Sequence, residues 1–89
     1  MPEIQIKKPT EEELKKLKLE RWSPWECEPS EFDWEYTDRE TCYILEGKVK
    51  VKTEDGEVEI QKGDLVTFPK GLKCKWNVLE KIRKVYKFG

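Results

Sequence analysis

The stretch Gly63-Asp64-Leu65-Val66-Thr67-Phe68-Pro69-Lys70-Gly71 decides the fold class, because it sets one β-rich segment between two turn signals. Lys62-Gly63-Asp64 predicts the first turn and Pro69-Lys70-Gly71 the second, since Gly, Asp and Pro favour turn conformations. Residues 65–68 between them are apolar or β-branched, which is typical of a short strand.

The same alternation of strands and turns continues on both sides of this stretch. Thr41-Cys42-Tyr43-Ile44-Leu45 predicts a strand, Glu46-Gly47 predicts a turn after it, and Asp55-Gly56 is a strong hairpin signal. Further strands are expected at residues 48–52, 73–79 and 82–88. Short strands at this spacing predict an all-β sandwich or barrel.

The N-terminal third adds one helix and an irregular segment. Residues 3–7 alternate as a strand would, and Thr10 with Glu13 forms the capping-box pattern that begins a helix. We expect one short α-helix over residues 11–18, with a solvated charged face. Residues 22–34 are rich in Trp and Pro, which indicates edge strands and turns.

Length and composition limit the classes of function. The chain has 89 residues, enough for one domain, with 36% hydrophobic and 42% charged residues. Its net charge of −1 argues against a nucleic-acid partner, which calls for a cationic surface. The bias toward Lys and Glu is typical of thermostable proteins and of designed or consensus sequences alike.

Two absences exclude further classes. The sequence contains no histidine, which removes the usual general base and the commonest metal ligand. It also has no apolar run long enough for a membrane span or a signal peptide, so no membrane partner is expected. Cys27, Cys42 and Cys74 are odd in number and form no CxxC pair, which predicts reduced thiols in a cytoplasmic protein.

Two stretches carry a resemblance to the cupin superfamily. Glu40-Thr41-Cys42-Tyr43-Ile44-Leu45-Glu46-Gly47 is similar to the end of the first cupin motif in its Glu, its apolar strand and its closing Gly. Residues 63–74 resemble the second motif, in which a Gly, a strand and a Pro-x-Gly turn precede a histidine. Cys74 stands in the place of that histidine.

Further residues resemble one branch of the superfamily. Phe32-Asp33-Trp34-Glu35-Tyr36 and Cys74-x-Trp76 are similar to the small single-domain group related to the ureidoglycine aminohydrolase cupin domain and an ethanolamine-utilisation cupin. The resemblance implies a jelly-roll β-barrel and often a homodimer. It covers residues 30–89, so residues 1–89 are expected to form a single cupin domain, with residues 1–29 as its N-terminal strand, helix and Trp/Pro-rich segment.

The departures from the cupin pattern concern the metal ligands. The two histidines of the first motif fall on Trp34-x-Tyr36 or on Asp33-x-Glu35, and of the usual ligand set only Glu40 is kept. We therefore expect no metal and no other cofactor, because cupin metal sites depend on neutral imidazoles. The alternative is a carboxylate–thiolate metal site in which Glu40 and Cys74 recruit Asp33 or Glu35.

Strand alternation predicts which side chains face the barrel interior. If Glu40 points inward, Cys42 and Ile44 follow, and if Cys74 does, Trp76 and Val78 follow. The expected ligand-binding residues are Trp34, Tyr36, Glu40, Cys42, Cys74 and Trp76. The candidate catalytic residues are Glu40 as general acid or base, Cys74 as nucleophile and Tyr36 as hydroxyl donor.

Three functions remain open at this point. The first, which we favour, is a cupin that binds a small polar metabolite in a metal-free pocket, with or without transforming it. The second is the metal-dependent enzyme, and the third is a non-catalytic dimeric module whose barrel is plugged by its own aromatic residues. A homodimer is expected because Trp22 and Trp25 need a cover, by a partner or by the chain itself. If Glu40 has no partner, Glu40→Gln is expected to leave the melting temperature unchanged or raised.

Overall fold

The computed structural model describes residues 4–89, and the all-β prediction is confirmed there. The strands are β1 (Gln5–Lys7), β2 (Ser23–Cys27), β3 (Ser30–Glu35), β4 (Glu40–Thr53), β5 (Gly56–Gln61), β6 (Leu65–Phe68) and β7 (Lys73–Phe88). A short α-helix, α1 (Glu11–Leu17), and a 3-10 helix, η1 (Leu19–Arg21), lie between β1 and β2. No helix within residues 4–89 is long and apolar enough to cross a membrane.

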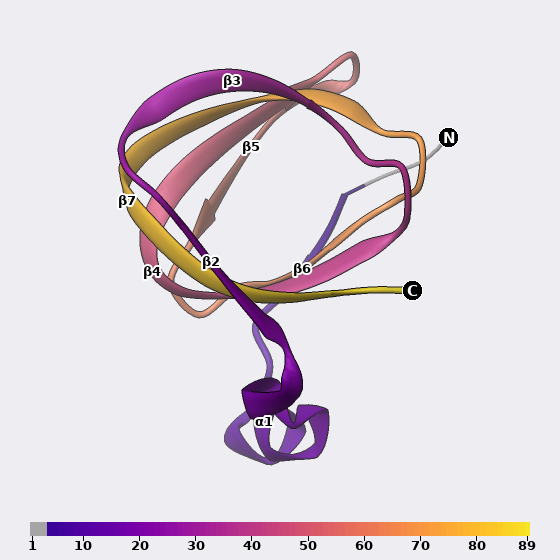
Figure 1. Ribbon diagram of the computed structural model, residues 1–89, viewed down its shortest axis with the longest axis vertical. Coiled ribbons are helices and arrows are strands. Elements are labelled where there is room, and N and C mark those ends of the chain that lie inside the picture. The colour runs from indigo at the N-terminus through magenta and orange to yellow at the C-terminus, as the bar shows by residue number, and fades with distance from the viewer. Residues whose placement is uncertain (1–3) are drawn as a thin grey trace.

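The two long strands β4 and β7 pair with each other and form the middle of the sheet that closes into the barrel. All pairs are antiparallel, in the order β1-β6-β4-β7-β2, while β5 adds to β4 and β3 adds to β7. Besides each other, the long strands have two further neighbours each. The first part of β4 pairs with β6 and its second part with β5, while the first part of β7 pairs with β3 and its second part with β2. Figure 1 shows the result as a ring of strands.

Two of the predicted strand boundaries are wrong, and both lie where the barrel bends. Glu46-Gly47 does not end a strand, because β4 runs through it with register shifts against β7. Likewise, residues 73–79 and 82–88 belong to one strand, β7. A β-bulge bends a strand without ending it, which lets both strands curve around the barrel.

Gly47 is the residue that makes this bend possible. Its φ is +95°, and a Cβ built on it would lie 2.2 Å from the Lys81 carbonyl oxygen of β7. Only glycine combines a positive φ with so close an approach of a neighbouring backbone. The closing Gly of the first motif therefore has a packing role at the crossing of β4 and β7.

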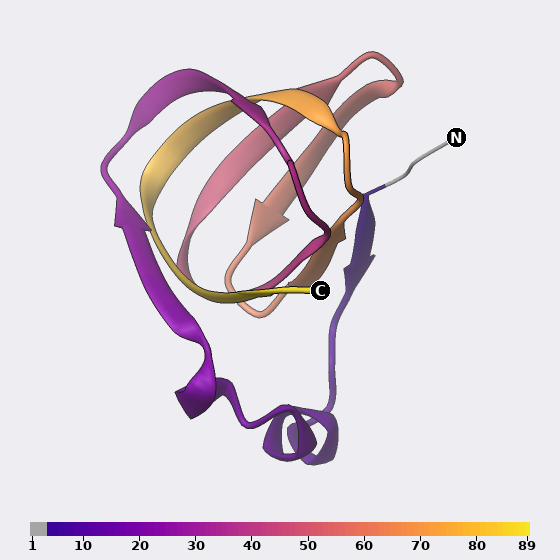
Figure 2. The ribbon, with the colours of Figure 1, turned by 45° about the vertical axis from the view of Figure 1, so that its right-hand side comes forward.

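The helical elements of the N-terminal third lie outside the ring. The capping box is confirmed, since the Glu13 amide donates to Thr10 and the Thr10 amide donates to Glu13. The helix ends at Leu17, one residue earlier than predicted, because Lys18 adopts a left-handed conformation with φ 54°. Figure 2 shows α1 below the ring, between β1 and β2. Of the strand predicted at residues 3–7, Glu3 lies outside the described residues.

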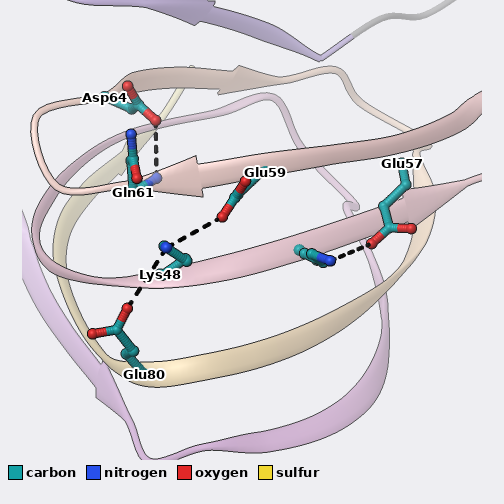
Figure 3. Close-up of polar contacts among 7 residues, drawn as sticks. Lys48, Glu57, Glu59, Gln61, Asp64 and Glu80 are labelled. Atoms are coloured by element: carbon teal, nitrogen blue, oxygen red, sulfur yellow. Dashed lines mark hydrogen bonds and ion pairs between the residues drawn. The ribbon is translucent and has the colours of Figure 1, made fainter.

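Polar side chains hold neighbouring strands together on the outer face of the barrel. Lys48 of β4 lies 3.5 Å from Glu59 of β5 and 3.9 Å from Glu80 of β7 (Figure 3). Asp64 caps the turn before β6, because its carboxylate accepts from the Gln61 backbone N–H at 2.9 Å (Figure 3). The Lys and Glu side chains of β4, β5 and β7 are thus arranged as cross-strand pairs.

The interior follows the predicted alternation. Glu40, Cys42 and Ile44 of β4 are buried, as are Cys74 and Trp76 of β7, so these strands present the expected faces. The remaining core residues are mainly aliphatic and aromatic: Tyr36, Val49, Val51, Ile60, Val66, Phe68, Leu72, Val78 and Ile82.

The chain itself covers the tryptophans that suggested a partner. Trp22 is only 9% exposed and has the Lys87 ammonium 5.2 Å from its ring centroid. Trp25 is half-buried against the core. The two rings therefore no longer argue for a second subunit.

Candidate functional site

A buried ion pair joins Glu40 of β4 to Lys84 of β7. The Lys84 Nζ lies 2.8 Å from Glu40 Oε2, and the two side chains are 6% and 7% exposed. The two residues are 44 positions apart in the chain and meet because β4 and β7 pair. Such a pair is expensive to desolvate unless its geometry is good, so its presence inside a small barrel calls for an explanation.

Aromatic rings surround the Lys84 ammonium. Its Nζ lies 5.0 Å from the ring centroid of Trp25, 4.9 Å from that of Trp76 and 5.6 Å from that of Tyr86. Trp25 is directly opposite Lys84 in the register of β2 and β7. Cation–π attraction within about 6 Å and the Glu40 carboxylate together hold the ammonium in place.

The ion pair forms part of the wall of a cavity. The cavity has a volume of about 200 Å³ and opens to the surface. It is lined by Trp25, Phe32, Trp34, Tyr36, Glu40, Trp76, Lys84, Tyr86 and Phe88. Every lining residue except Glu40 and Lys84 is aromatic, so the cavity offers flat apolar walls with one charged pair, a combination typical of small-molecule sites.

The structure brings together four of the predicted ligand-binding residues. Trp34, Tyr36, Glu40 and Trp76 all line the cavity, although Trp34 stays 51% exposed at its edge. Cys42 is fully buried and is not among the lining residues.

Cys74 lines a separate, more open depression on the surface. Its other lining residues are Asp33, Trp34, Glu35 and Lys73. The aromatic and carboxylate parts of the expected pocket thus come together, while the thiols lie beside it.

Tyr36 is held in place by the turn that follows β6. Its backbone N–H donates to Leu72 at 2.8 Å, and its carbonyl accepts from Gly71 at 2.6 Å. Its ring stacks on Phe68 with centroids 4.5 Å apart. Burial, with Glu40 nearby, raises the pKa of Tyr36 well above its usual range, so the hydroxyl stays protonated and can donate to a ligand.

Both thiols near the cavity are protonated at neutral pH. Burial raises the pKa of Cys42 to about 12 and that of Cys74 to about 11. A nucleophilic cysteine needs a lowered pKa, since the thiolate is the reactive form. The environment of Cys74 thus favours a neutral thiol over the nucleophile predicted from the sequence.

Residues 14–86 match the family of EutQ-like cupin domains. The chain belongs to this family. The predicted resemblance to small cupins related to the ethanolamine-utilisation cupin is thereby confirmed, and the antiparallel barrel described above is a cupin jelly roll. No curated protein matches the chain significantly.

Solved cupin structures agree with this assignment. A DUF861-family protein from Thermotoga maritima is 62% identical, with a TM-score of 0.95, covering 98% of this chain and 100% of that one. The EutQ protein of Clostridium difficile is 27% identical, with a TM-score of 0.65, and the match covers 71% of this chain and 50% of that one. A DUF861-family protein of unknown function from Pseudomonas syringae is 29% identical over 71% of this chain and 28% of that one, with a TM-score of 0.64.

The residues of this cupin do not fit the metal ion that its superfamily often carries. Tyr36 is buried at the cavity while Asp33 and Glu35 are exposed, so the first-motif histidines correspond to Trp34-x-Tyr36, neither of which is a usual ligand. The Glu40 carboxylate is already neutralised by Lys84, whose ammonium would repel a metal cation. Among residues 4–89, no three His, Cys, Asp or Glu side chains gather closely enough to hold a metal.

The residue that sequence reasoning missed is Lys84. The alternation that makes Cys74, Trp76 and Val78 face inward is interrupted at the exposed Glu80 and resumes at Ile82 and Lys84, which are also buried. This signal was available in the sequence, but a lysine in such a strand normally reaches solvent. Trp25, Phe32, Tyr86 and Phe88 were not predicted as lining residues either.

Proposed function

We propose that this cupin binds a small organic molecule in the cavity beside Glu40 and Lys84, without a metal ion. The observation that carries the proposal is the buried ion pair in the wall of an open, aromatic-lined cavity. Aromatic walls supply contact area, and a few fixed polar groups supply orientation, which is how small-molecule sites are generally built.

The ion pair supports binding better than it supports stability. Replacing a buried pair by apolar residues of similar volume is often neutral or stabilising, so stability alone gives little reason to keep it. Here the pair also lies at a cavity wall, where a ligand can reach its remaining hydrogen-bonding positions. A binding role accounts for both facts.

The plugged-barrel alternative receives less support. Tyr36 and Phe68 stack on each other, and Phe68 packs against Trp76, so aromatic rings do fill much of the interior. They nevertheless leave about 200 Å³ of open volume at Glu40. A module whose only task was structural would gain by filling that space, because unfilled volume forfeits packing contacts.

The proposal also includes the roles and partners expected from the sequence. Glu40 and Tyr36 contact the ligand, and any proton transfer falls to them, with Cys74 at the margin as a neutral thiol. A homodimer in the cytoplasm stays part of the proposal on the strength of the family resemblance. Light scattering at high protein concentration tests the dimer, and the mass of one chain would contradict it.

The four tryptophans allow a direct test of ligand binding. A mixture of small metabolites is titrated into ¹⁵N-labelled protein while the indole N–H signals are followed by NMR. Ligands of the cavity are expected to shift the signals of Trp25, Trp34 and Trp76, which line it. The Trp22 indole lies elsewhere, against Lys87, and serves as the internal control. Shifts confined to Trp22, or none for any compound, would overturn the proposal.

A further inference from the structure

The cavity already contains its own cation. An aromatic enclosure of this kind would otherwise suit a ligand ammonium group, but the Lys84 ammonium takes that place, within 5.6 Å of Trp25, Trp76 and Tyr86. A second cation would meet Lys84 at close range, with the carboxylate of Glu40 already engaged. The site therefore disfavours cationic ligands, whereas an unpaired Glu40 carboxylate would favour them.

Apart from the second oxygen of Glu40, the free polar groups around the cavity are hydrogen-bond donors. An ammonium has three N–H groups, and the contact with Glu40 uses one of the three on Lys84. The Tyr36 hydroxyl keeps its proton because burial raises its pKa. These donors call for an acceptor, which is the opposite of what an unpaired carboxylate would select.

One donor in the cavity wall lacks a well-formed hydrogen bond. Trp76 is 2% exposed, and its indole Nε1–H makes no hydrogen bond within the described part of the chain. An unsatisfied buried donor is destabilising and is rare in folded proteins. The Tyr36 hydroxyl and the Cys74 thiol lie near this indole, and a ligand oxygen that reached it would supply a better acceptor than either.

The remaining walls favour a flat ligand. The rings of Trp25 and Trp76 meet edge to face at 79°, while Phe32 stacks on Trp76 with centroids 6.1 Å apart. A planar body can pack against such faces and edges with the offset or T-shaped geometry that aromatic groups prefer. A bulky saturated ligand would use these walls less well.

We propose that the ligand is a small planar carboxylate, whose oxygens accept from Lys84 and whose flat body packs between the aromatic walls. This inference rests on the proposed function and narrows it to one chemical class. The Glu40–Lys84 pair is neutral overall, so the preference comes from the donors that face the ligand rather than from net charge. We expect a selectivity of about tenfold over a matched cation, a modest value for partly compensated charge.

Three probes of similar size separate the classes: benzoate, benzamide and benzylammonium. Each is titrated into the protein while the Trp25 and Trp76 indole signals are followed, and the dissociation constants are compared. Benzoate is expected to bind about tenfold more tightly than benzylammonium, with benzamide between them. Equal or tighter binding of benzylammonium would overturn the carboxylate assignment and leave the binding cavity standing.

A double variant tests whether Lys84 is the source of the preference. Glu40→Gln/Lys84→Gln removes both charges together, so neither is left buried and unpaired. Its ratio of benzylammonium to benzoate dissociation constants is expected to fall from about ten to near one, while benzamide binding changes little. An unchanged ratio would overturn the role of Lys84. If none of the three probes moves the cavity signals of the parent protein, the planar-carboxylate inference fails, while the metabolite titration described above decides the proposed function.

Discussion

Lys84 Nζ lies 2.8 Å from Glu40 Oε2 inside the barrel, so the carboxylate at the position that the cupin pattern gives to a metal ligand is paired with a lysine. This relationship changes the expected chemistry of the site. A lone buried carboxylate would favour a metal or a cationic ligand, whereas a paired one leaves donors free. It also changes what substitution of Glu40 does to stability.

Glu40→Leu is expected to lower the free energy of unfolding by about 3–5 kcal/mol, because it leaves the Lys84 ammonium buried without its counter-charge. Glu40→Gln should lose less, since its amide oxygen still accepts from Lys84. This replaces the sequence-based expectation of an unchanged or raised melting temperature, which assumed that Glu40 had no partner.

The double variant Glu40→Leu/Lys84→Met is the matched control for this prediction. It removes both charges and should recover most of the lost stability, as replacements of buried ion pairs by apolar residues often do. Urea denaturation of the parent, Glu40→Leu, Lys84→Met and the double variant measures the coupling between the two residues. Additive losses in the double variant would show that the two residues act independently.

Gly47→Ala is expected to destabilise the protein by about 3 kcal/mol or more, because a Cβ there would strike the Lys81 carbonyl oxygen while φ stays positive. Gly63→Ala is the matched control, with a φ of +92° and no atom within 4 Å of the added Cβ. It suffers only the conformational strain, about 1–2 kcal/mol. Similar losses in the two variants, measured by thermal melts, would contradict the packing role of Gly47.

The strands were predictable from sequence where local signals decide the structure. The turns around residues 63–71, the Asp55-Gly56 hairpin and the capping box at Thr10 all depend on neighbouring residues, and all are observed. Glu46-Gly47 carries the same local signals as a turn. Only the approach of Lys81 from the far end of the chain makes it a bulge, and no local pattern contains that contact.

The candidate site was predictable to a similar extent. Strand alternation placed Glu40 and Trp76 inside, and the cupin spacing placed Tyr36 beside them, as observed. Lys84 was not predicted because the burial of a lysine depends on its partners. Glu40 and Trp25 reach it only through the pairing of β4 and β2 with β7. A polar interior is therefore harder to predict than an apolar one, since each member needs the others.

Elemental analysis of protein purified without added metal is expected to find no stoichiometric transition metal. The reason is chemical: the cavity offers no imidazole, a carboxylate already bound to Lys84, and a Cys74 thiol whose pKa is raised to about 11. Addition of a chelator should leave the melting temperature unchanged. About one Mn, Fe, Ni or Zn per chain would contradict this and restore the metal-dependent alternative.

The buried thiols are expected to make the protein lose stability at alkaline pH. Burial raises the pKa of Cys42 from 9.0 to about 12, so the folded state holds this proton more tightly than the unfolded state does. Stability is therefore fully present below pH 9 and declines as the pH rises toward the folded value. At a pH of about 10 the loss from Cys42 is about 1 kcal/mol.

Variants of one buried cysteine, Cys42, and one half-buried cysteine, Cys27, test the loss of stability at alkaline pH. Cys42→Ala should lower stability at pH 7 by leaving a small void, but it should flatten the decline between about pH 8.5 and 10. Cys27→Ala, at a half-buried position on β2, should keep the parent's slope. Denaturant melts across this pH range supply the comparison. An equal slope in the parent and Cys42→Ala would show that the loss comes from other groups, with Cys74, whose pKa is raised to about 11, as the next to be replaced.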